Sequence, residues 1–333
     1  MEIDALQRRR EERLRAIRRR RRNALSLFAL VLAIAIVLVV LLSATGKSGG
    51  KSRGGHAPLS SAARTARSRS SAGGSRRTVT KSGTPGGGVA TGRLGTTSVP
   101  ILMYHVIAPA PAGAPFPGLY VPPEEFSAQM HALARAGWTA VTQDQLEAYW
   151  KRGISLPRGK PIVVSFDNGY QSQYTSALPV LRSLGWVGDE NIQLTGLPPS
   201  QGGLSRRQVR GLLAAGWELD TQGISHADLI TLDARQLTEQ TAGARKTIQR
   251  RYGVPVNWFC YPSGHYDATV LAAVKAAGFV GSTTVVPGWA RPSGDPYRLP
   301  RLRVLGGTSA QSLLTELAAI RDDPSPPASY NGA

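Results

Sequence analysis

The chain has a single cysteine, Cys260, so no disulfide can form within it. This cysteine lies in the apolar segment 258–261, which has the composition of a buried strand. No histidine is paired with it in the sequence, and we therefore expect a packed core thiol rather than a nucleophile. Without disulfides, the fold must be stabilised by burial of apolar side chains.

Charged residues are absent from 24–46, a segment dominated by Leu, Val, Ile and Ala. As a helix it would extend roughly 34 Å at about 1.5 Å per residue, enough to cross a hydrocarbon layer of about 30 Å. The apolar part of a cleaved signal peptide is shorter, about 7–15 residues. We therefore expect a transmembrane signal anchor, with a cleaved signal peptide and a buried soluble helix as alternatives.

Acidic residues are few in 1–23, where ten arginines face four acids and an arginine block at 18–22 abuts the apolar segment. Dense positive charge favours the cytoplasmic side of a membrane. We therefore expect a single-pass protein of the cell membrane, with a basic cytoplasmic N-terminal tail and an extracytoplasmic main domain. An inverted topology, with the main domain in the cytoplasm, is the alternative.

Acidic residues are also absent from 47–98, and large apolar side chains are rare there. The segment holds ten Lys and Arg residues among Gly, Ser, Thr and Ala, so it cannot offset its ordering entropy by burial. We expect a disordered basic linker that attracts anionic envelope polymers or lipid headgroups, the alternative being a solvated spacer. Its predicted extracytoplasmic side argues against nucleic acid as a partner.

Beyond residue 98, apolar runs of strand length alternate with segments of helical period. Strands are expected near 99–106, 138–141, 161–166, 190–195, 217–221, 257–261, 279–284 and 301–305. Helices are expected near 123–136, 143–151, 172–184, 205–215, 233–251, 267–277 and 308–321. This alternation predicts an α/β domain over 99–322, with a mostly parallel sheet covered by helices. The Pro- and Ser-rich end, 323–333, is expected to be a flexible tail.

Two polar segments follow predicted strands. The first, SFDNG at 165–169, ends an apolar run in an acidic residue at a glycine turn. The second, QGISH at 222–226, offers one imidazole. Because α/β enzymes form their sites at the carboxyl ends of strands, the two segments are candidates for one hydrolase site.

These segments resemble the motifs of polysaccharide deacetylases, the NodB-homology family of carbohydrate esterase family 4. The likeness is greatest to the extracytoplasmic poly-N-acetylglucosamine deacetylase branch. Further matches occur in the family's order: ILMYH at 101–105, FCYPSG at 259–264 and LPR at 299–301. The resemblance extends from Val99 to the C-terminus and implies a distorted (β/α)7-type barrel, preceded here by the transmembrane helix and the disordered linker.

The resemblance also implies roles for the matched residues. Asp167 stands at the family's general base and His105 at its general acid. Arg301 stands at an arginine that can pair with the base. The positions that correspond to the family's substrate-binding strand end are Tyr261, Pro262 and Gly264.

The metal-ligand positions depart from the family. His226 stands at one ligand position, but Asn168 and Gln222 stand where the family has Asp and His. The resemblance implies a divalent metal, zinc or similar. However, the two changes remove the anionic ligand and exchange an imidazole for a weak amide oxygen. We therefore expect metal binding and catalysis to be weakened or lost.

Three residues near these segments are candidate replacement ligands: His265, Asp267 and Asp228. The alternative is that they have capping or surface roles, and Asp267 in particular precedes a predicted helix.

Two functions remain open. In the first, a membrane-anchored extracytoplasmic protein acts on N-acetylated cell-envelope glycan or exopolysaccharide by amide hydrolysis, with weakened or lost catalysis. In the second, it is a non-catalytic glycan-binding pseudoenzyme. Four tryptophans are candidates for stacking on sugar rings, although core packing is the default for each: Trp186, Trp217, Trp258 and Trp289.

Overall fold

The computed structural model describes residues 88–197, 202–321 and 326–332. The expected cytoplasmic tail, the transmembrane segment and most of the linker therefore lie outside the described residues. Among the helices that are described, none combines the length and the apolar character that crossing a membrane requires. The described residues belong to one compact unit, Thr78–Ala333.

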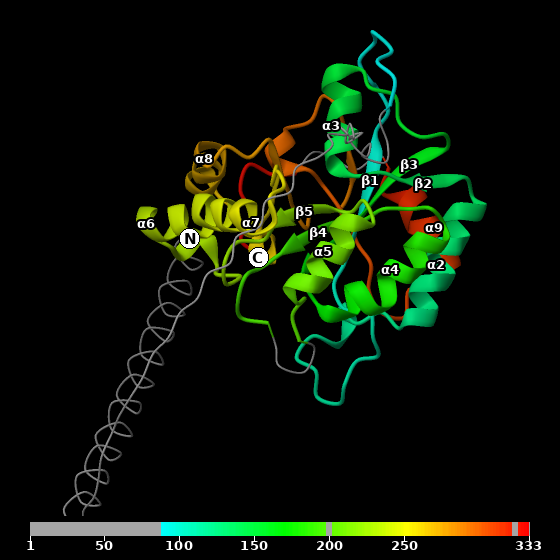
Figure 1. The fold of residues 1–333 in the computed structure, drawn as a ribbon, viewed down its shortest axis with the longest axis horizontal. Helices are drawn as coiled ribbons and strands as arrows, with labels where there is room; N and C mark the ends of the chain where they lie inside the picture. Colours follow the sequence, from blue (N-terminus) through cyan, green and yellow to red (C-terminus); the bar gives the residue numbers. More distant parts are fainter. Residues whose placement is uncertain (1–87, 198–201, 322–325, 333) are drawn as a thin grey trace, which may run out of the picture. The chain divides into compact units, whose positions relative to one another are not determined.

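A mostly parallel sheet forms the centre of this unit (Figure 1). Its described strands are β1 (Val99–Tyr104), β2 (Trp138–Ala140), β3 (Lys160–Asn168), β4 (Asp189–Ile192), β5 (Glu218–Thr221), β6 (Trp258–Cys260), β7 (Gly281–Thr283), β8 (Trp289–Ala290) and β9 (Leu302–Arg303). The order is β7-β6-β5-β4-β3-β1-β8, with β2 paired to β3 and β9 to β1. A parallel bridge between Thr283 and Leu299 links β7 to the segment that leads into β9. The arrangement fits the expected distorted barrel.

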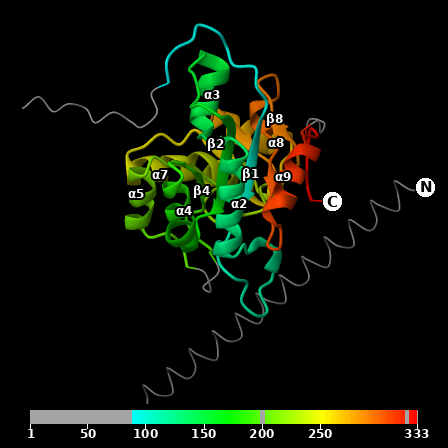
Figure 2. The same cartoon turned by 90° about the vertical axis from the view of Figure 1, so that its right-hand side faces the viewer.

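Helices surround this sheet on the outside (Figures 1 and 2). They are α2 (Pro123–Arg135), α3 (Gln143–Arg152), α4 (Leu178–Ser183), α5 (Arg206–Ala214), α6 (Ala234–Thr238), α7 (Ala244–Tyr252), α8 (Ala268–Ala276) and α9 (Ala310–Ala319). Thr142 and Ser205 cap α3 and α5 through reciprocal bonds with Gln145 and Gln208. The predicted alternation is confirmed, whereas the antiparallel strand β8 was not predicted, because two residues give no periodic signal.

Two predicted helices contain π-helical turns. Gln173–Ala177 precedes α4, and Glu239–Gly243 joins α6 to α7. Such turns are rare and often lie at functional sites. Periodicity predicts the surrounding helix but gives no signal for the inserted residue.

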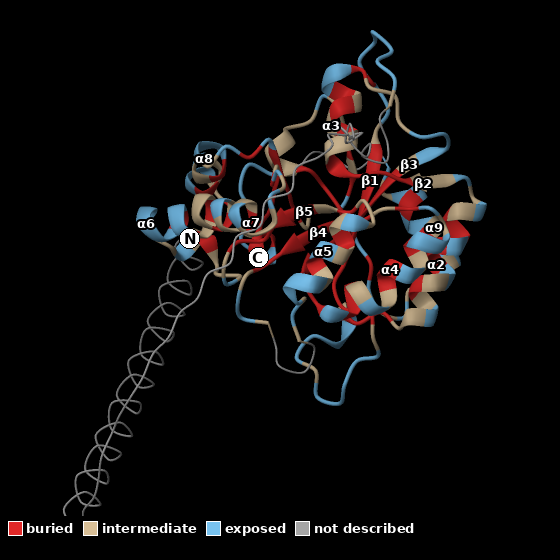
Figure 3. Cartoon of the chain, in the orientation of Figure 1, coloured by how far each residue is buried: buried red, intermediate tan, exposed pale blue. Residues whose placement is uncertain are grey.

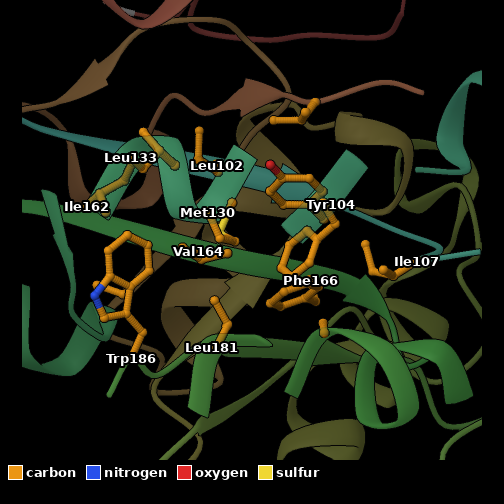
Figure 4. Packing of buried hydrophobic residues seen from close by; sticks show 14 of the residues in the cluster. Leu102, Tyr104, Ile107, Met130, Leu133, Ile162, Val164, Phe166, Leu181 and Trp186 are labelled. Carbon is orange, nitrogen blue, oxygen red and sulfur yellow. The ribbon is translucent and has the colours of Figure 1, made fainter. Parts of the chain in front are cut away.

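Apolar side chains fill the space between the sheet and its helices. One cluster packs Tyr104 and Phe166 from the strands against Phe126 of α2 (Figure 4 shows part of it). The rings of Tyr104 and Phe126 meet edge-on, with centroids 5.1 Å apart. Figure 3 shows buried strands inside a partly exposed helical layer. Each fully buried Leu or Phe stabilises the fold by about 1.5–3 kcal/mol relative to exposure.

Both ends of the described domain extend beyond the expected boundaries. Ala90 bridges to Ile154, and the amide of Gly95 donates to the carbonyl of Tyr149, so the domain begins before residue 99. At the other end, Tyr330 pairs with Tyr266 through two backbone hydrogen bonds. The described part of the expected tail, 326–332, is therefore attached to the domain, because its backbone finds partners that its composition does not reveal.

Candidate functional site

The candidate residues gather where the parallel strands end. Asp167 of β3 lies opposite Asn191 of β4, which lies opposite Asp220 of β5. Tyr104 of β1 lies opposite Phe166, so the next residue, His105, is level with Asp167. Strand register thus brings the predicted motifs together at the carboxyl edge, as expected for α/β folds.

Asp167 is held by Arg301 in a buried bidentate ion pair. Nη1 donates to Oδ1 over 2.8 Å and Nη2 to Oδ2 over 2.9 Å. Asn191 Nδ2 donates to Oδ1 over 3.0 Å, and the Cys260 thiol donates to Oδ2 over 3.4 Å. Burial by itself raises the pKa of Asp167, but the Arg301 charge and hydrogen bonds, with His105 and Asn191, lower it to about 2. The predicted pairing of Arg301 with Asp167 is confirmed.

The thiol of Cys260 is packed rather than reactive. Its side chain is fully buried, and burial raises its pKa to about 12. It also accepts a hydrogen bond from Arg301 Nη2 over 3.2 Å. The expectation of a packed core thiol is confirmed, although this thiol touches the Asp167–Arg301 pair.

His105 lies beside the carboxylate but is not charged near neutral pH. Its Nε2 is 4.0 Å from Oδ2 of Asp167. Burial lowers its pKa to about 4 although the Asp167 charge opposes this, and Arg301, Arg303 and His226 lower it further. Within the described residues, its buried Nδ1 has no hydrogen-bond partner. The imidazole is therefore a neutral hydrogen-bonding group at pH 7, and its predicted role as a proton donor remains a prediction.

The three expected metal-ligand positions hold side chains with different partners. Asn168 Nδ2 donates to Oε1 of Gln193 over 2.6 Å. Gln222 is 2% exposed, and its Oε1 has no hydrogen-bond partner in the part of the chain that the structure describes. Burial lowers the pKa of His226, although Asp167 opposes this shift. Among the described residues, these positions thus offer a free amide oxygen and an imidazole but no anionic ligand.

This donor set does not fit a zinc-type hydrolytic metal. Such sites usually combine imidazole or thiolate with a carboxylate, whereas neutral amide oxygens suit hard cations better. In the described residues, no three His, Cys, Asp or Glu side chains are grouped so that they could hold a metal. We therefore derive no chemical step through a metal.

The candidate replacement ligands are engaged elsewhere. His265 Nδ1 lies 3.1 Å from Oδ1 of Asp228, so these two residues pair with each other. Asp267 caps α8 by accepting from the amide of Val270, which confirms its interpretation as an N-cap. None of the three completes a ligand set with His226.

The predicted substrate-binding turn lies at the carboxyl end of β6. Tyr261 is fully buried, and its hydroxyl donates to the carbonyl of Tyr297. Pro262 and Gly264 are buried too, while Ser263 between them is exposed. The side chain of Tyr261 therefore packs in the core, and the binding role of this turn remains a prediction.

None of the four candidate tryptophans is placed to stack on a sugar at this edge. Trp186, Trp217 and Trp258 are buried in core clusters. Trp289 lies opposite Pro100 near the start of β1, at the other end of the strand from His105. The default interpretation as core packing is confirmed for the three buried tryptophans, whereas Trp289 is half-buried and its ring meets that of Trp138 edge-on.

Backbone conformation is unusual at three strand ends of the site. Within the described ranges, the non-glycine residues with positive φ are Asn168 (78°), His226 (52°) and Ser263 (55°). They follow or end β3, β5 and β6. Left-handed backbone is costly for residues with a Cβ, and such strain concentrates at functional sites.

Two glutamines from the π-helical turns hold the loops of the site, and sequence reasoning missed both. Gln173 Nε2 donates to the carbonyls of His105 and Asp167, each over 2.8 Å. Gln240 Oε1 accepts from the amides of Ile224 and Ser225, directly before His226. No local signal marks these residues, since each contact joins separate segments of the chain.

Comparisons with known proteins agree with the geometry. The family model for polysaccharide deacetylases matches residues 156–282. A curated Bacillus subtilis protein, "Putative polysaccharide deacetylase YxkH", is 27% identical over 215 residues, which is 64% of this chain and 74% of that protein.

Solved structures share the fold. The Streptococcus pyogenes deacetylase PplD, solved in complex with acetate, aligns with a TM-score of 0.61 and 23% identity, covering 67% of this chain and 99% of that one. IcaB from Ammonifex degensii aligns with a TM-score of 0.56 and 23% identity, covering 67% and 98%.

Proposed function

This chain contains a polysaccharide deacetylase domain, and we propose that it binds N-acetylated glycan of the cell envelope while hydrolysing its amides weakly or not at all. The observation that supports the loss of hydrolysis is the donor set at the ligand positions, where Asn168 and Gln222 are neutral amides. Amide hydrolysis in this family relies on a divalent metal, which activates water and polarises the carbonyl. Without an anionic ligand, this site would hold such a metal poorly.

The preserved half of the site supports retention of glycan binding. Asp167 remains fixed by Arg301, and His105 remains beside it. Gln222 offers an unpartnered amide oxygen, which can accept a hydrogen bond from a sugar hydroxyl or an acetamido N–H group. These groups can orient a polar ligand without a metal.

Weak metal-independent hydrolysis is the second candidate function. The proximity of the His105 imidazole to the Asp167 carboxylate favours it, because one group could accept a proton and the other could donate one. The depressed pKa of His105 and the engagement of both Asp167 oxygens by Arg301 limit this chemistry. We therefore assign binding as the principal function.

Membrane anchoring and extracytoplasmic location are part of the proposal. They are supported by the uncharged segment 24–46 and the arginine-rich segment 1–23. A reporter fused after Ala333 tests the topology: exposure outside the cytoplasm supports the proposal, and exposure in the cytoplasm contradicts it.

Function is tested on the full-length chain in detergent. The native protein is compared with the Asn168→Asp/Gln222→His variant for zinc content and for acetate release from N-acetylglucosamine oligomers. We expect oligomer binding by both proteins, and stoichiometric zinc with acetate release only in the variant. Stoichiometric zinc and rapid acetate release by the native chain would overturn the proposed loss of hydrolysis.

A further inference from the structure

An arginine outside the predicted site lies at its edge. Arg301 and Arg303 are two residues apart at β9, so their side chains leave the same face of the strand. Leu302 between them packs in the outer core cluster with Tyr104. Arg303 therefore shares the site-facing side with Arg301, but it is exposed whereas Arg301 is buried. It lies one pleat nearer the carboxyl edge, and its charge contributes to the lowered pKa of His105.

The charge of Arg303 is not balanced locally. Its side chain makes no ion pair or hydrogen bond with the described residues, whereas Arg301 takes both oxygens of Asp167. The ligand positions add no negative charge, since Asn168 and Gln222 are neutral. Two other carboxylates of the described domain have their own partners. Asp228 pairs with His265, and the Glu125 carboxylate accepts from the amide of Gly307 and from Gln129.

Exposed apolar side chains occur in the segment that follows this arginine and in the loop bonded to that segment. Phe116 is 68% exposed and Leu305 is 41% exposed, whereas most large apolar side chains of the described domain are buried. The amide of Gly306 donates to the carbonyl of Gly118 over 2.9 Å, which fastens the exit of β9 to the loop that carries Phe116. The same loop bonds Val106, the residue after His105, through the carbonyl of Leu119. The loop that carries Phe116 is thus bonded both to the segment after Arg303 and to the residue after His105.

We propose that the glycan bound at this site is anionic, and that Arg303 recognises its acidic group while a sugar ring rests on Phe116. The inference builds on the proposed glycan binding and names the class of glycan. The planar guanidinium offers paired donors that match a carboxylate or a phosphate. The flat face of an aromatic ring suits the apolar face of a sugar ring, and Phe116 is exposed in the loop to which the exit of β9 is bonded.

Isothermal titration calorimetry on the full-length chain in detergent tests the proposal with three probes. A hyaluronan hexasaccharide carries N-acetylglucosamine and sugar carboxylates, a neutral N-acetylglucosamine hexamer carries no charge, and an N-acetylglucosamine-substituted poly(glycerol phosphate) oligomer carries phosphates. We expect the native chain to bind at least one anionic probe about tenfold more tightly than the neutral hexamer, which is the effect of about one charged hydrogen-bonded contact. The anionic probe that binds with the higher affinity shows whether the recognised group is a carboxylate or a phosphate.

Two variants distinguish the contact of Arg303 with the acidic group from a general attraction of anionic probes to the basic linker. Arg303→Gln should remove the preference for the anionic probe and leave the neutral hexamer unaffected. Arg158→Gln is the matched control, because Arg158 is exposed before β3 at the opposite edge of the sheet. It removes the same charge and should retain the preference. Phe116→Ala should lower the affinity for every probe that binds the native chain.

The outcomes distinguish this inference from the function on which it rests. If the native chain binds neutral and anionic probes equally, or if both arginine variants lose the same affinity, the inference is overturned while glycan binding stands. If no probe binds a folded native chain, the proposed function fails, and this inference fails with it. Thermal unfolding of each variant verifies that it is folded.

Discussion

The side-chain amide of Asn168 donates to Oε1 of Gln193 over 2.6 Å, and Gln193 in turn donates from Nε2 to the carbonyl of Thr195. The position that would present an anionic ligand is thus joined to a chain of neutral amides. This network explains how the strand end is stabilised without a metal, since buried polar groups must find partners.

Restoring a carboxylate at this position should disturb the network before it creates a metal site. In Asn168→Asp, the new oxygen would face the acceptor oxygen of Gln193, so the Gln193 amide must turn and give up its bond to Thr195. We expect a loss of about 1 kcal/mol in the free energy of unfolding.

Zinc should offset that loss only when Gln222→His is also present. At a zinc concentration about 100-fold above its Kd, the double variant should gain about 2.7 kcal/mol. Thermal melts with and without zinc measure both effects. Equal stabilisation of the single and double variants would show that Gln222 is not a ligand position.

Arg301→Met should be strongly destabilising because it leaves a buried carboxylate unpaired. Removing one partner of a buried ion pair costs about 3–5 kcal/mol. Urea unfolding of the native chain and the variant measures this loss. Asp167→Asn/Arg301→Met should recover part of it, whereas the exposed control Arg303→Gln should change stability by less than about 0.5 kcal/mol. A double variant as unstable as Arg301→Met would contradict the assignment to an unpaired charge.

Stability should decrease as pH rises through the neutral range. Burial raises the pKa of Asp220 to about 8, although hydrogen bonds from Glu218 and the amide of Trp258 oppose this. Burial, with the nearby Asp220 and Asp144 charges, raises the pKa of Glu218 as well. Between the unfolded pKa near 4 and the folded pKa near 8, the folded state binds the extra proton. The free energy of unfolding therefore falls by about 1.4 kcal/mol per pH unit for each such proton.

Asp220→Asn tests this pH dependence. In the native chain, Asp220 Oδ1 accepts hydrogen bonds from the backbone amides of Asn257 and Trp258. The side-chain oxygen of the new asparagine can accept the same two bonds. Urea titrations from pH 4 to pH 9 should show a flatter profile for the variant. Asp167 does not contribute to this slope. Its pKa is lowered to about 2, so the stability that its charged form provides is lost only in acid, as pH falls. An unchanged slope would contradict the assignment to Asp220.

Gln240→Leu should loosen the loop that carries His226. The side chain of Gln240 accepts from two loop amides and donates to the Ser225 hydroxyl, so the variant leaves those groups without partners. We expect faster amide exchange at Ile224 and Ser225 and weaker glycan binding, with a stability loss of about 1–3 kcal/mol. Gln240→Glu keeps the acceptor and should preserve the loop. Unchanged hydrogen exchange at both amides in Gln240→Leu would show that Gln240 does not hold this loop.

The sequence by itself determined the local features of this protein. Apolar period predicted the strands and helices beyond residue 98, and the position of Asp267 before a predicted helix indicated the N-cap of α8. An apolar run that ends in Asp167 specifies a carboxylate at a strand end, whatever packs around it. These features depend on neighbours within a few residues, which periodicity and capping chemistry describe.

Only the tertiary structure decided which groups meet. Asp167 and Arg301 are 134 positions apart, and Asn168 and Gln193 are 25 apart, so both contacts depend on strand register and helix packing. The same packing buried three of the four candidate tryptophans, depressed the pKa of His105 and left Arg303 and Phe116 exposed. Burial and electrostatics are sums over all neighbours in space, and a linear pattern does not contain them.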